Sequence, residues 1–252
     1  MEIPEAVKVA LPDTAKDRIR PVQSAVSSVL HRGTQVECPV CGGTFRRFLR
    51  FKGRKGAQCP RCRTMERHRL LTLFLKRETD LFDGQPKRLL HVAPEWFMQK
   101  HLKKIPGVQY VSGDLLSPHA MIALDVTDLP FRDGWFDVVM CSHVLEHVDD
   151  SDLAMRELFR VLRPGGWGIL DAPVDWDRED TYEDWSVTDP ADRERVFGQR
   201  DHVRLFGRTY PQLLDRAGFD VHLDEYALEP GERERYGLRP DMDHIWMCRK
   251  PA

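Results

Sequence analysis

Four cysteines in this chain have the spacing of a metal-binding site. Cys38-Pro-Val-Cys41 and Cys59-Pro-Arg-Cys62 are two Cys-x-x-Cys pairs separated by 17 residues, close to the spacing of four-thiolate zinc sites. Gly42 follows the first pair, where a tight metal-binding turn needs a positive φ. Four thiolates complete a tetrahedron and leave no coordination position for water. The pattern predicts a structural Zn²⁺ with ligands Cys38, Cys41, Cys59 and Cys62, and an iron–sulfur cluster is the alternative.

The other two cysteines, Cys141 and Cys248, lie within apolar runs and are expected to be buried thiols. Residues Met1 to Ala10 include acidic side chains and a proline, where a secretory signal has a basic start and an apolar stretch. We therefore expect a cytoplasmic protein whose cysteines are metal ligands or core thiols and not disulfides. No apolar run approaches the ~20 residues that span a bilayer, so the sequence does not predict membrane insertion.

The basic residues are concentrated around the cysteines. Residues 31–77 contain 13 Lys or Arg and 2 Asp or Glu, a local charge of +11, although the formal net charge of the whole chain is −2. The rest of the chain therefore carries a charge of −13. A basic segment beside an acidic body favours an anionic partner such as nucleic acid or a phosphorylated molecule. The alternative is that a metal module too small to bury much surface has a charged exterior.

The elements that must position these residues fall into three parts. The 252 residues are enough for one α/β domain with a full core and a smaller appendage. We predict an N-terminal extension over residues 1–35, a zinc-ribbon module with a linking helix over 36–80, and a larger domain over 85–252. Apolar residues recur at helical spacing along the linking helix, Glu66–Glu78, so this helix should pack onto the larger domain.

Short apolar runs alternate with helical patterns after the turn at Asp83-Gly84. This alternation is typical of a parallel sheet built from βαβ units. The clearest helix is Asp152–Leu162, with Ser151 as its N-cap and Pro164-Gly165-Gly166 as its end. The runs expected to be strands are Arg88–Ala93, Gln109–Ser112, Met121–Leu124, Phe136–Cys141 and Gly168–Asp171, followed by Phe219–Leu223 and His244–Arg249.

Four sequence blocks follow one another in this region. They are Asp125-Val-Thr-Asp-Leu-Pro-Phe131, Trp135-Phe-Asp-Val-Val139, His143-Val-Leu-Glu-His147 and Arg160-Val-Leu-Arg-Pro-Gly-Gly166. Their order and spacing resemble class I S-adenosylmethionine-dependent methyltransferases of the type-11 branch, over about residues 87 to 250. The resemblance implies an α/β, Rossmann-like fold, with a mostly parallel sheet and helices on both faces. It also implies a transferase whose cofactor is S-adenosyl-L-methionine.

The resemblance indicates which residues hold this cofactor. Asp114 matches the acid that accepts hydrogen bonds from the two ribose hydroxyls. Asp125 and Val126 match the pair that contacts the adenine. Ser142 and His143 match positions lining the methyl-transfer cleft, beyond the carboxyl ends of the strands. The alternative for the two aspartates is that both are only turn residues.

The loop after the first strand departs from the family. A Gly-x-Gly loop is usual there, but this chain reads Leu90-His-Val-Ala-Pro-Glu95-Trp96. Ala93 and Pro94 can still form a tight turn, and Glu95 can bind the ammonium group of the cofactor. A subgroup of the family pairs such a loop with an upstream cysteine module and a Glu-Arg-His-Arg segment, here Glu66–Arg69. The residues expected to bind the cofactor are His91, Ala93, Glu95, Asp114, Leu115, Asp125, Val126, Ser142 and His143.

Catalytic candidates lie mainly in segment 171–207, which follows the fifth strand, where this fold usually carries substrate-side insertions. His202 is the strongest candidate for a general base, because the ordinary pKa of histidine lies near neutrality. The residues expected to be catalytic are His202, His143 and Tyr182, and further candidates are Glu183, Asp184 and Arg204. The alternative for each is a solvated or ion-paired loop residue.

The string His143-Val-Leu-Glu146-His147 also matches the His-x-x-Glu-His motif of inverted zinc peptidases. Such a peptidase needs the motif in the middle of a helix, whereas here it directly follows an apolar strand. We therefore interpret His147 as a packing or capping residue.

Three functions fit these observations. The first is methyl transfer to an oxygen or nitrogen of a small-molecule or saccharide substrate. The second is RNA methylation, in which the basic zinc module holds phosphates, as in 23S rRNA guanine methyltransferases that begin with a zinc ribbon. The third is a non-catalytic, zinc-dependent binding protein on a methyltransferase fold, suggested by the missing glycine loop. The sequence does not indicate an oligomeric state.

Overall fold

The computed structural model describes residues 15–226, 228–239 and 244–252. The part of the predicted extension before residue 15 lies outside the described residues. From residue 15 on, the extension is a helix, α1 (Ala15–Leu30). Arg63 Nε donates a hydrogen bond to Ser24 Oγ at 3.2 Å, so this helix lies against the second cysteine pair.

The cysteine module is built from two antiparallel hairpins, β1–β2 and β3–β4. The first cysteine pair forms the turn between β1 and β2, and the second pair follows β4. Phe45 and Phe48 are buried with the cysteines in a small core. The bounds are β1 (Arg32–Cys38), β2 (Gly43–Phe45), β3 (Leu49–Phe51), β4 (Arg54–Gln58) and the helix α2 (Glu66–Glu78), whose bounds agree with the sequence prediction.

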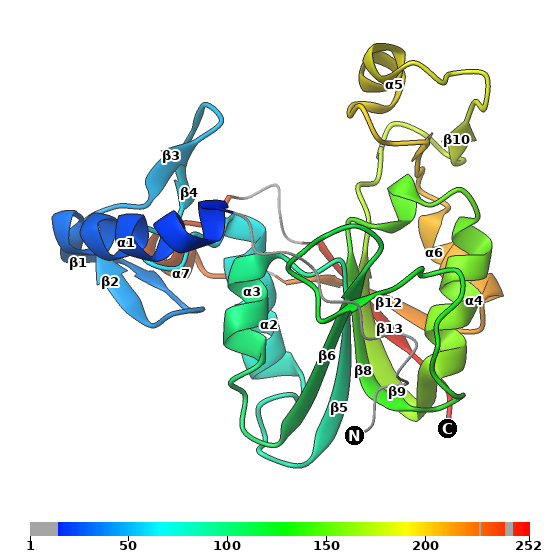
Figure 1. Ribbon diagram of the computed structural model, residues 1–252, viewed down its shortest axis with the longest axis horizontal. Helices are drawn as coiled ribbons and strands as arrows, with labels where there is room; N and C mark the ends of the chain where they lie inside the picture. Colours follow the sequence, from blue (N-terminus) through cyan, green and yellow to red (C-terminus); the bar gives the residue numbers. More distant parts are fainter. Residues whose placement is uncertain (1–14, 227, 240–243) are drawn as a thin grey trace.

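A seven-stranded sheet forms the centre of the molecule (Figure 1). Its strand order is β12-β13-β9-β8-β5-β6-β7, and only β13 runs antiparallel to its neighbours. The predicted α/β class with a mostly parallel sheet is therefore confirmed. The strands are β5 (Lys87–Val92), β6 (Val108–Asp114), β7 (Ile122–Ala123), β8 (Phe136–Ser142), β9 (Leu162–Asp171), β12 (Asp220–Glu225) and β13 (His244–Arg249).

Helices cover both faces of the sheet (Figure 1). On one face, α2 and α3 (Trp96–Leu102) enclose a core that includes Leu70, Phe74 and Leu89. On the other face, α4 (Ser151–Val161) and α6 (Tyr210–Arg216) enclose a core that includes Leu158 and Phe219. Packing of α2 onto the sheet confirms the predicted link between the module and the larger domain.

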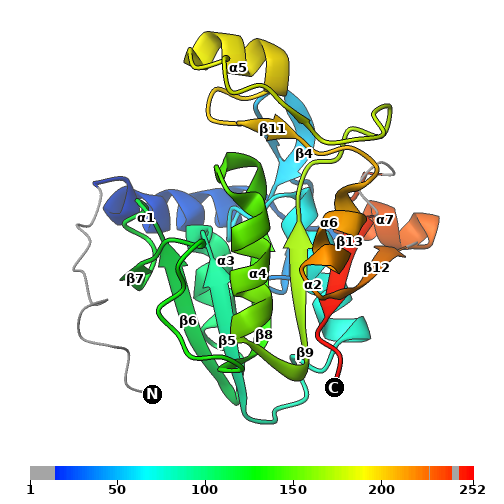
Figure 2. The same ribbon diagram turned by 90° about the vertical axis from the view of Figure 1, so that its right-hand side faces the viewer.

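Two insertions extend from this domain. The strand β10 (Tyr182–Glu183), the helix α5 (Pro190–Phe197) and the strand β11 (Arg204–Leu205) stand beyond the carboxyl end of β9 (Figure 2). The helix α7 (Pro230–Tyr236) follows β12 and precedes β13 in the chain, and it contacts the cysteine module. Gly237, with φ of 58°, ends α7 so close to the module that a Cβ there would lie 2.5 Å from the Phe48 ring.

The sequence prediction was wrong at the start of β9. Leu162 already pairs with Phe136, and Trp167 pairs with Val138, so the Pro-Gly-Gly run forms a bulge inside the strand. The predicted helix therefore ends one residue early, at Val161. Its N-cap is Asp150, whose side chain accepts a hydrogen bond from Leu153 N, and not Ser151. Asp150 is favoured because its carboxylate also lies at the positive end of the helix dipole.

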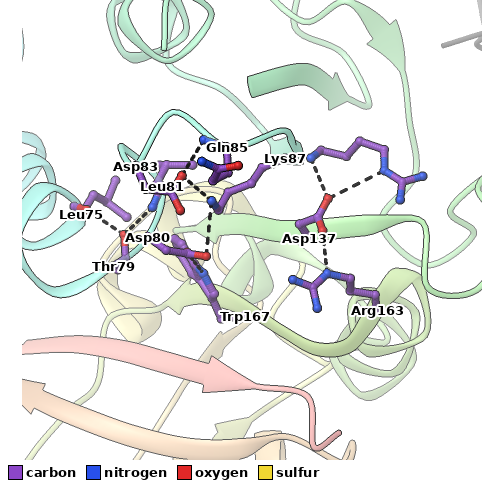
Figure 3. Close-up of polar contacts among 11 residues, drawn as sticks. Leu75, Thr79, Asp80, Leu81, Asp83, Gln85, Lys87, Asp137, Arg163 and Trp167 are labelled. Atoms are coloured by element: carbon purple, nitrogen blue, oxygen red, sulfur yellow. Dashed lines mark hydrogen bonds and ion pairs between the residues drawn. The ribbon is translucent and has the colours of Figure 1, made fainter. Parts of the chain in front are cut away.

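Ion pairs and hydrogen bonds hold the amino ends of the strands together (Figure 3). Lys87 Nζ contacts Asp83 Oδ1 at 2.6 Å and Asp80 Oδ2 at 3.4 Å. Trp167 Nε1 donates to Asp80 Oδ1, so the loop after α2 is tied to β9. This network lies at the edge of the sheet opposite the loops described next. Among the described residues, no helix is both long and apolar enough to cross a membrane.

Candidate functional site

Two cavities meet at the carboxyl ends of the parallel strands. The first, which we call the aspartate cavity, has a volume of 740 Å³ and is lined by Asp114 and Asp125. The second, the tryptophan cavity, has a volume of 290 Å³ and is lined by Trp176 and Trp246. His143 lines both cavities. All nine residues predicted to bind a cofactor line one or both of them: Ala93, Asp114, Leu115, Asp125, Val126 and His143 line the aspartate cavity, and His91, Glu95, Ser142 and His143 line the tryptophan cavity.

The two aspartates are held in local turns that leave one oxygen of each available. Asp114 Oδ1 accepts hydrogen bonds from the backbone of Leu116 and Ser117. Asp125 Oδ1 accepts from the backbone and hydroxyl of Thr127. Within the described residues, Oδ2 of each carboxylate has no such bond. Oδ1 of each aspartate therefore stabilises a local turn. Oδ2 of each can accept a hydrogen bond from a ligand hydroxyl or amino group.

Ala93 and His143 adopt the left-handed conformation, which is strained for residues with a Cβ. Their φ angles are 48° and 57°. Each turn is fixed by a backbone bond to the neighbouring strand end: Ala93 N donates to Gly113 O and His143 N to Asp171 O, both at 2.8 Å. Ala93 thus makes the turn that a glycine usually makes in this fold, and the small methyl group limits the strain.

Glu95 lies at the start of α3 and faces the helix that follows the cysteine module. His68 Nε2 donates a hydrogen bond to Glu95 Oε1 at 2.7 Å, and Arg67 lies 3.2 Å from the same oxygen. The tautomer of His68 is defined because its Nδ1 accepts from Met65 N at 3.0 Å. Burial raises the pKa of Glu95, but His68 and the neighbouring positive groups outweigh it and hold this pKa well below its ordinary range. Glu95 is therefore a fixed anion in the cavity wall.

Asp171 is a site residue that sequence reasoning did not single out. It ends β9 in the tryptophan cavity, where its carboxylate accepts from Trp246 N at 3.0 Å and from Ser142 Oγ at 3.3 Å. Burial raises the pKa of Asp171 to about 6. A carboxylate with such a pKa can accept a proton near neutrality. Its position at the end of the fifth strand was the signal in the sequence.

Aromatic rings form one wall of the tryptophan cavity. Trp176 stacks on Trp246 with ring centroids 6.4 Å apart and an interplanar angle of 18°, and it also contacts His244. Trp176 is 43% exposed, so part of its side chain remains accessible. On the other side of the sheet, His91 donates or accepts a hydrogen bond with the Tyr110 hydroxyl, and burial lowers the pKa of His91 to about 4. His91 is therefore a neutral wall residue.

The predicted catalytic residues are not all brought together. His143 is 40% exposed between the two cavities. His202 is only 3% exposed and lies against His147, and burial lowers its pKa. Tyr182 packs against Phe197 in the insertion and does not line either cavity.

The further candidates in the insertion have structural partners. Arg204 is 1% exposed and pairs with Glu183 at 2.6 Å, and it donates to the carbonyls of Leu145, Val148 and Asp149. Asp184 accepts from Ser186 in a local turn. Arg204 and Glu183 thus join the insertion to the loop after β8.

The four cysteine sulfurs converge as the spacing predicts. They lie within 4.8 Å of one another, with Cys38 and Cys62 Sγ 3.6 Å apart and Cys41 and Cys59 Sγ 3.8 Å apart. Four sulfurs bound tetrahedrally at ~2.3 Å lie about 3.8 Å apart, so the cluster fits a zinc ion. Gly42 and Arg63, the residues after the two pairs, both have a φ of 65°. The Thr64 hydroxyl lies 2.9 Å from Cys62 Sγ and can donate to the thiolate.

Comparison with known proteins agrees with the geometry of the sheet. Residues 98–170 match the family model Methyltransf_11, described as a methyltransferase domain. The match begins after the Ala93–Trp96 turn, where the chain departs from the family pattern. It confirms the resemblance predicted from the four sequence blocks.

Curated relatives match over a short segment. A ubiquinone/menaquinone biosynthesis C-methyltransferase of Vibrio campbellii is 47% identical over 45 residues, which are 18% of this chain and 17% of the relative. A demethylmenaquinone methyltransferase of Streptomyces avermitilis is 50% identical over 46 residues, 18% of this chain and 20% of the relative. The chain thus aligns with at most a fifth of the length of these relatives.

Solved structures resemble the chain over a larger part of its length. An S-adenosylmethionine-dependent methyltransferase of Mesorhizobium loti is 17% identical, with a TM-score of 0.51, over 72% of this chain and 98% of that one. The [4+2]-cyclase SpnF is 14% identical, with a TM-score of 0.53, over 97% and 100% of the two chains. Residues 98–170 therefore match a methyltransferase domain, the solved structures share the fold of the sheet, and the four-cysteine module precedes this region in the chain.

Proposed function

We propose that this protein transfers a methyl group from S-adenosyl-L-methionine to an oxygen or nitrogen atom of a small molecule or saccharide. The observation that carries the proposal is the position of His143 between two cavities of different chemistry. The aspartate cavity offers carboxylate oxygens for a ribose and an amino group, and the tryptophan cavity offers an aromatic wall. The sulfonium of a cofactor in the first cavity would then face an acceptor in the second.

The cofactor is assigned to the aspartate cavity because of its hydrogen-bond acceptors. Asp114 Oδ2 would accept from the ribose hydroxyls, and Asp125 Oδ2 from the adenine amino group. The methionine end would extend past Ala93 toward Glu95, whose negative charge suits an ammonium group. This arrangement would give Ala93, Glu95, Asp114 and Asp125 roles in holding the cofactor without requiring a glycine loop.

The acceptor is assigned to the tryptophan cavity. Its volume of 290 Å³ suits one ring, and the accessible part of Trp176 could pack against a sugar or a planar ring. In the reaction, the acceptor atom bonds to the methyl carbon, the carbon–sulfur bond breaks, and its electron pair goes to the sulfur. A proton on the acceptor would pass to Asp171, because the raised pKa of this carboxylate suits a base near neutral pH. Positioning of the two reactants supplies much of the rate.

We further propose that the four cysteines hold a structural Zn²⁺. Its role is to order the helix α2, because Arg67 and His68 lie one turn beyond the second cysteine pair and reach the cavity wall. Arg69, which is fully buried, joins this helix to α7 through the carbonyls of Tyr236 and Gly237, at 2.7 Å each. The ion would thus stabilise one side of the methyl-transfer site.

RNA methylation is the second candidate function. The hairpin β3–β4 carries basic side chains that are exposed, namely Arg47, Arg50, Lys52 and Lys55. Phe45 and Phe48 are buried in the module core, however, and of the phenylalanines in the module only Phe51, which is 37% exposed, can stack on a base. The small-molecule proposal therefore has the better support.

The deciding experiment has two stages. Zinc-loaded protein is first titrated calorimetrically with S-adenosyl-L-methionine. Absence of binding would remove both enzymatic functions and leave the non-catalytic binding protein. Cofactor labelled in the methyl group is then incubated with hydroxylated and amino small molecules, saccharides and RNA.

Trp176→Ala serves as the matched variant for the acceptor. It should raise KM for a small-molecule acceptor about 10-fold or more and leave cofactor affinity unchanged. Labelling of RNA alone, with binding that weakens steeply with salt, would instead establish the second function.

A further inference from the structure

Three side chains meet beside the aspartate cavity and outside the cysteine module. Glu146 and His147 belong to a 3₁₀ helix (Leu145–His147) after β8, and His202 comes from the insertion before β11. One possible ligand atom of each lies within 4.8 Å of the others. Glu146 and His202 are 1% and 3% exposed, whereas His147 is partly exposed and lines the cavity.

Buried polar atoms in this cluster lack partners. Within the described residues, three buried atoms have no hydrogen-bond partner: the two carboxylate oxygens of Glu146 and Nε2 of His202. His143 Nδ1 lies 3.4 Å from Glu146 Oε1, which is too long for a good hydrogen bond. A buried polar group of this kind destabilises the fold when it is left unpaired. A missing ligand at this point would account for the arrangement.

The two histidines are oriented for coordination. His202 Nδ1 lies 3.1 Å from Phe197 O, and His147 Nδ1 lies 3.1 Å from Asp201 O. A carbonyl oxygen can only accept, so each ring donates through Nδ1–H and keeps a lone pair on Nε2. Histidines that bind metals almost always donate their other ring N–H to a carbonyl or carboxylate in this way.

The two segments that carry these residues are fixed to each other. Val203 N donates to Glu146 O at 3.0 Å, next to His202 in the chain. The Arg204 guanidinium donates to the carbonyls of Leu145, Val148 and Asp149, on both sides of Glu146 and His147. The cluster is therefore held by the backbone on both sides, as a binding site requires.

We propose that Glu146, His147 and His202 bind a divalent transition-metal ion, at a second site distinct from the four cysteines. Two imidazoles and one carboxylate form a ligand set of catalytic Zn²⁺ sites, and also suit Mn²⁺, Co²⁺ and Fe²⁺. Metal–ligand bonds of about 2.0–2.2 Å place two ligand atoms at most ~4.4 Å apart. Displacements of the side-chain atoms by a few tenths of an ångström would therefore bring all three ligand atoms within bonding distance of one ion. Three protein ligands leave coordination positions open.

An ion held by these three residues would border the aspartate cavity. His147 lines the aspartate cavity, and His143, which contacts Glu146, lines both cavities.

Mn²⁺ titration of the zinc-loaded full chain tests the site. Mn²⁺ is the probe because it prefers carboxylate and imidazole ligands to the thiolates of the cysteine module. We expect one Mn²⁺ per chain for the unaltered protein, and affinity at least ~100-fold weaker for His202→Ala and for Glu146→Gln. His222→Ala, an exposed histidine on β12, is the control and should bind like the unaltered protein. The titration contains no cofactor or acceptor, so its result is independent of the methyl-transfer proposal.

Folding of each variant is checked by its zinc content and far-ultraviolet circular dichroism. Where His202→Ala fails to fold, His147→Ala replaces it, because His147 is partly exposed and contributes to the same ligand set. Mn²⁺ should also raise the thermal midpoint of the unaltered protein and not that of the variants. Absence of Mn²⁺, Co²⁺ or additional Zn²⁺ binding by the unaltered protein overturns the proposal. Equal affinity of the unaltered protein and the variants does so too, since it would place the ion on the exposed aspartates nearby.

Discussion

His68 Nε2 donates a hydrogen bond to Glu95 Oε1 across 2.7 Å, and this contact joins the cysteine module to the first loop of the parallel sheet. His68 Nδ1 in turn accepts from Met65 N, three residues beyond the second cysteine pair. The cavity wall at Glu95 therefore depends on a segment that is far away in the sequence. The module is part of the candidate site and not a separate appendage.

Removal of this contact should weaken cofactor binding. His68→Ala takes away the donor of a charge-assisted hydrogen bond, and burial then raises the pKa of Glu95. We expect affinity for S-adenosyl-L-methionine to fall about 10-fold at neutral pH, and further in acid, with zinc content unchanged. Calorimetry of the variant beside His222→Ala measures the effect. An unchanged affinity would show that Glu95 does not contact the cofactor.

Asp114→Asn should weaken cofactor binding without releasing zinc. The asparagine oxygen can still accept from Leu116 and Ser117, so the turn is kept and only the charge is lost. Loss of a charge-assisted pair of hydrogen bonds predicts an affinity about 10- to 100-fold lower. Equilibrium binding of S-adenosylhomocysteine measures it, with Asp125→Asn in parallel. Full affinity in the Asp114 variant would mean that β6 does not carry the ribose site.

Cys59→Ser should release zinc before it affects the cofactor. Its sulfur lies 3.8 Å from that of Cys41, and loss of one thiolate opens the tetrahedron. We expect about one zinc fewer per chain, a thermal midpoint lower by at least ~5 °C, and weaker cofactor binding as α2 loosens. Cys141→Ala, at a buried thiol in the sheet, is the control and should retain zinc. Retention of zinc by the serine variant would argue against a four-thiolate site.

Asp171→Asn should stabilise the protein in a pH-dependent way. The pKa of Asp171 is about 6 in the folded protein, above the ~3.9 of an unfolded aspartate. As pH rises from about 4 to 6, the Asp171 carboxyl ionises in the unfolded state before it does so in the folded protein. The free energy of unfolding therefore falls over this range and stays at the lower value at higher pH. The variant should thus match the unaltered protein near pH 4 and exceed it by about 1–3 kcal/mol at pH 8. Urea unfolding across this range measures it, and a pH-independent difference would contradict the raised pKa.

Arg204→Met should destabilise the insertion and the loop after β8. The substitution leaves Glu183 and three backbone carbonyls without their hydrogen-bond donor. Loss of one partner of a buried ion pair lowers the free energy of unfolding by about 3–5 kcal/mol. Arg208→Met is the matched control, because Arg208 pairs with Glu179 on the surface and is 51% exposed. That change should cost less than ~1 kcal/mol. Urea unfolding compares the two, and equal costs would show that Arg204 does not hold the loop.

Local patterns predicted most of the elements. The helix Glu66–Glu78 and the strand His244–Arg249 have the predicted bounds, because each is an unbroken periodic run between clear ends. The start of β9 could not be predicted in this way. A Pro-Gly-Gly run usually ends a helix or a strand. Here backbone hydrogen bonds, such as that from Lys250 N to Gly166 O, keep Pro164, Gly165 and Gly166 within β9.

The sequence by itself indicated the cluster of four cysteines, most of the sheet strands along the chain and the carboxylates at their ends, because these depend on spacing within short segments. Tertiary structure alone decided that His68 reaches Glu95, that the pKa of Asp171 is raised, and that His202 lies against Glu146 and His147. The reason is physical. Contact between distant segments decides which groups form hydrogen bonds, and burial decides how much free energy a charged side chain costs. Neither can be read from the neighbouring residues in the chain.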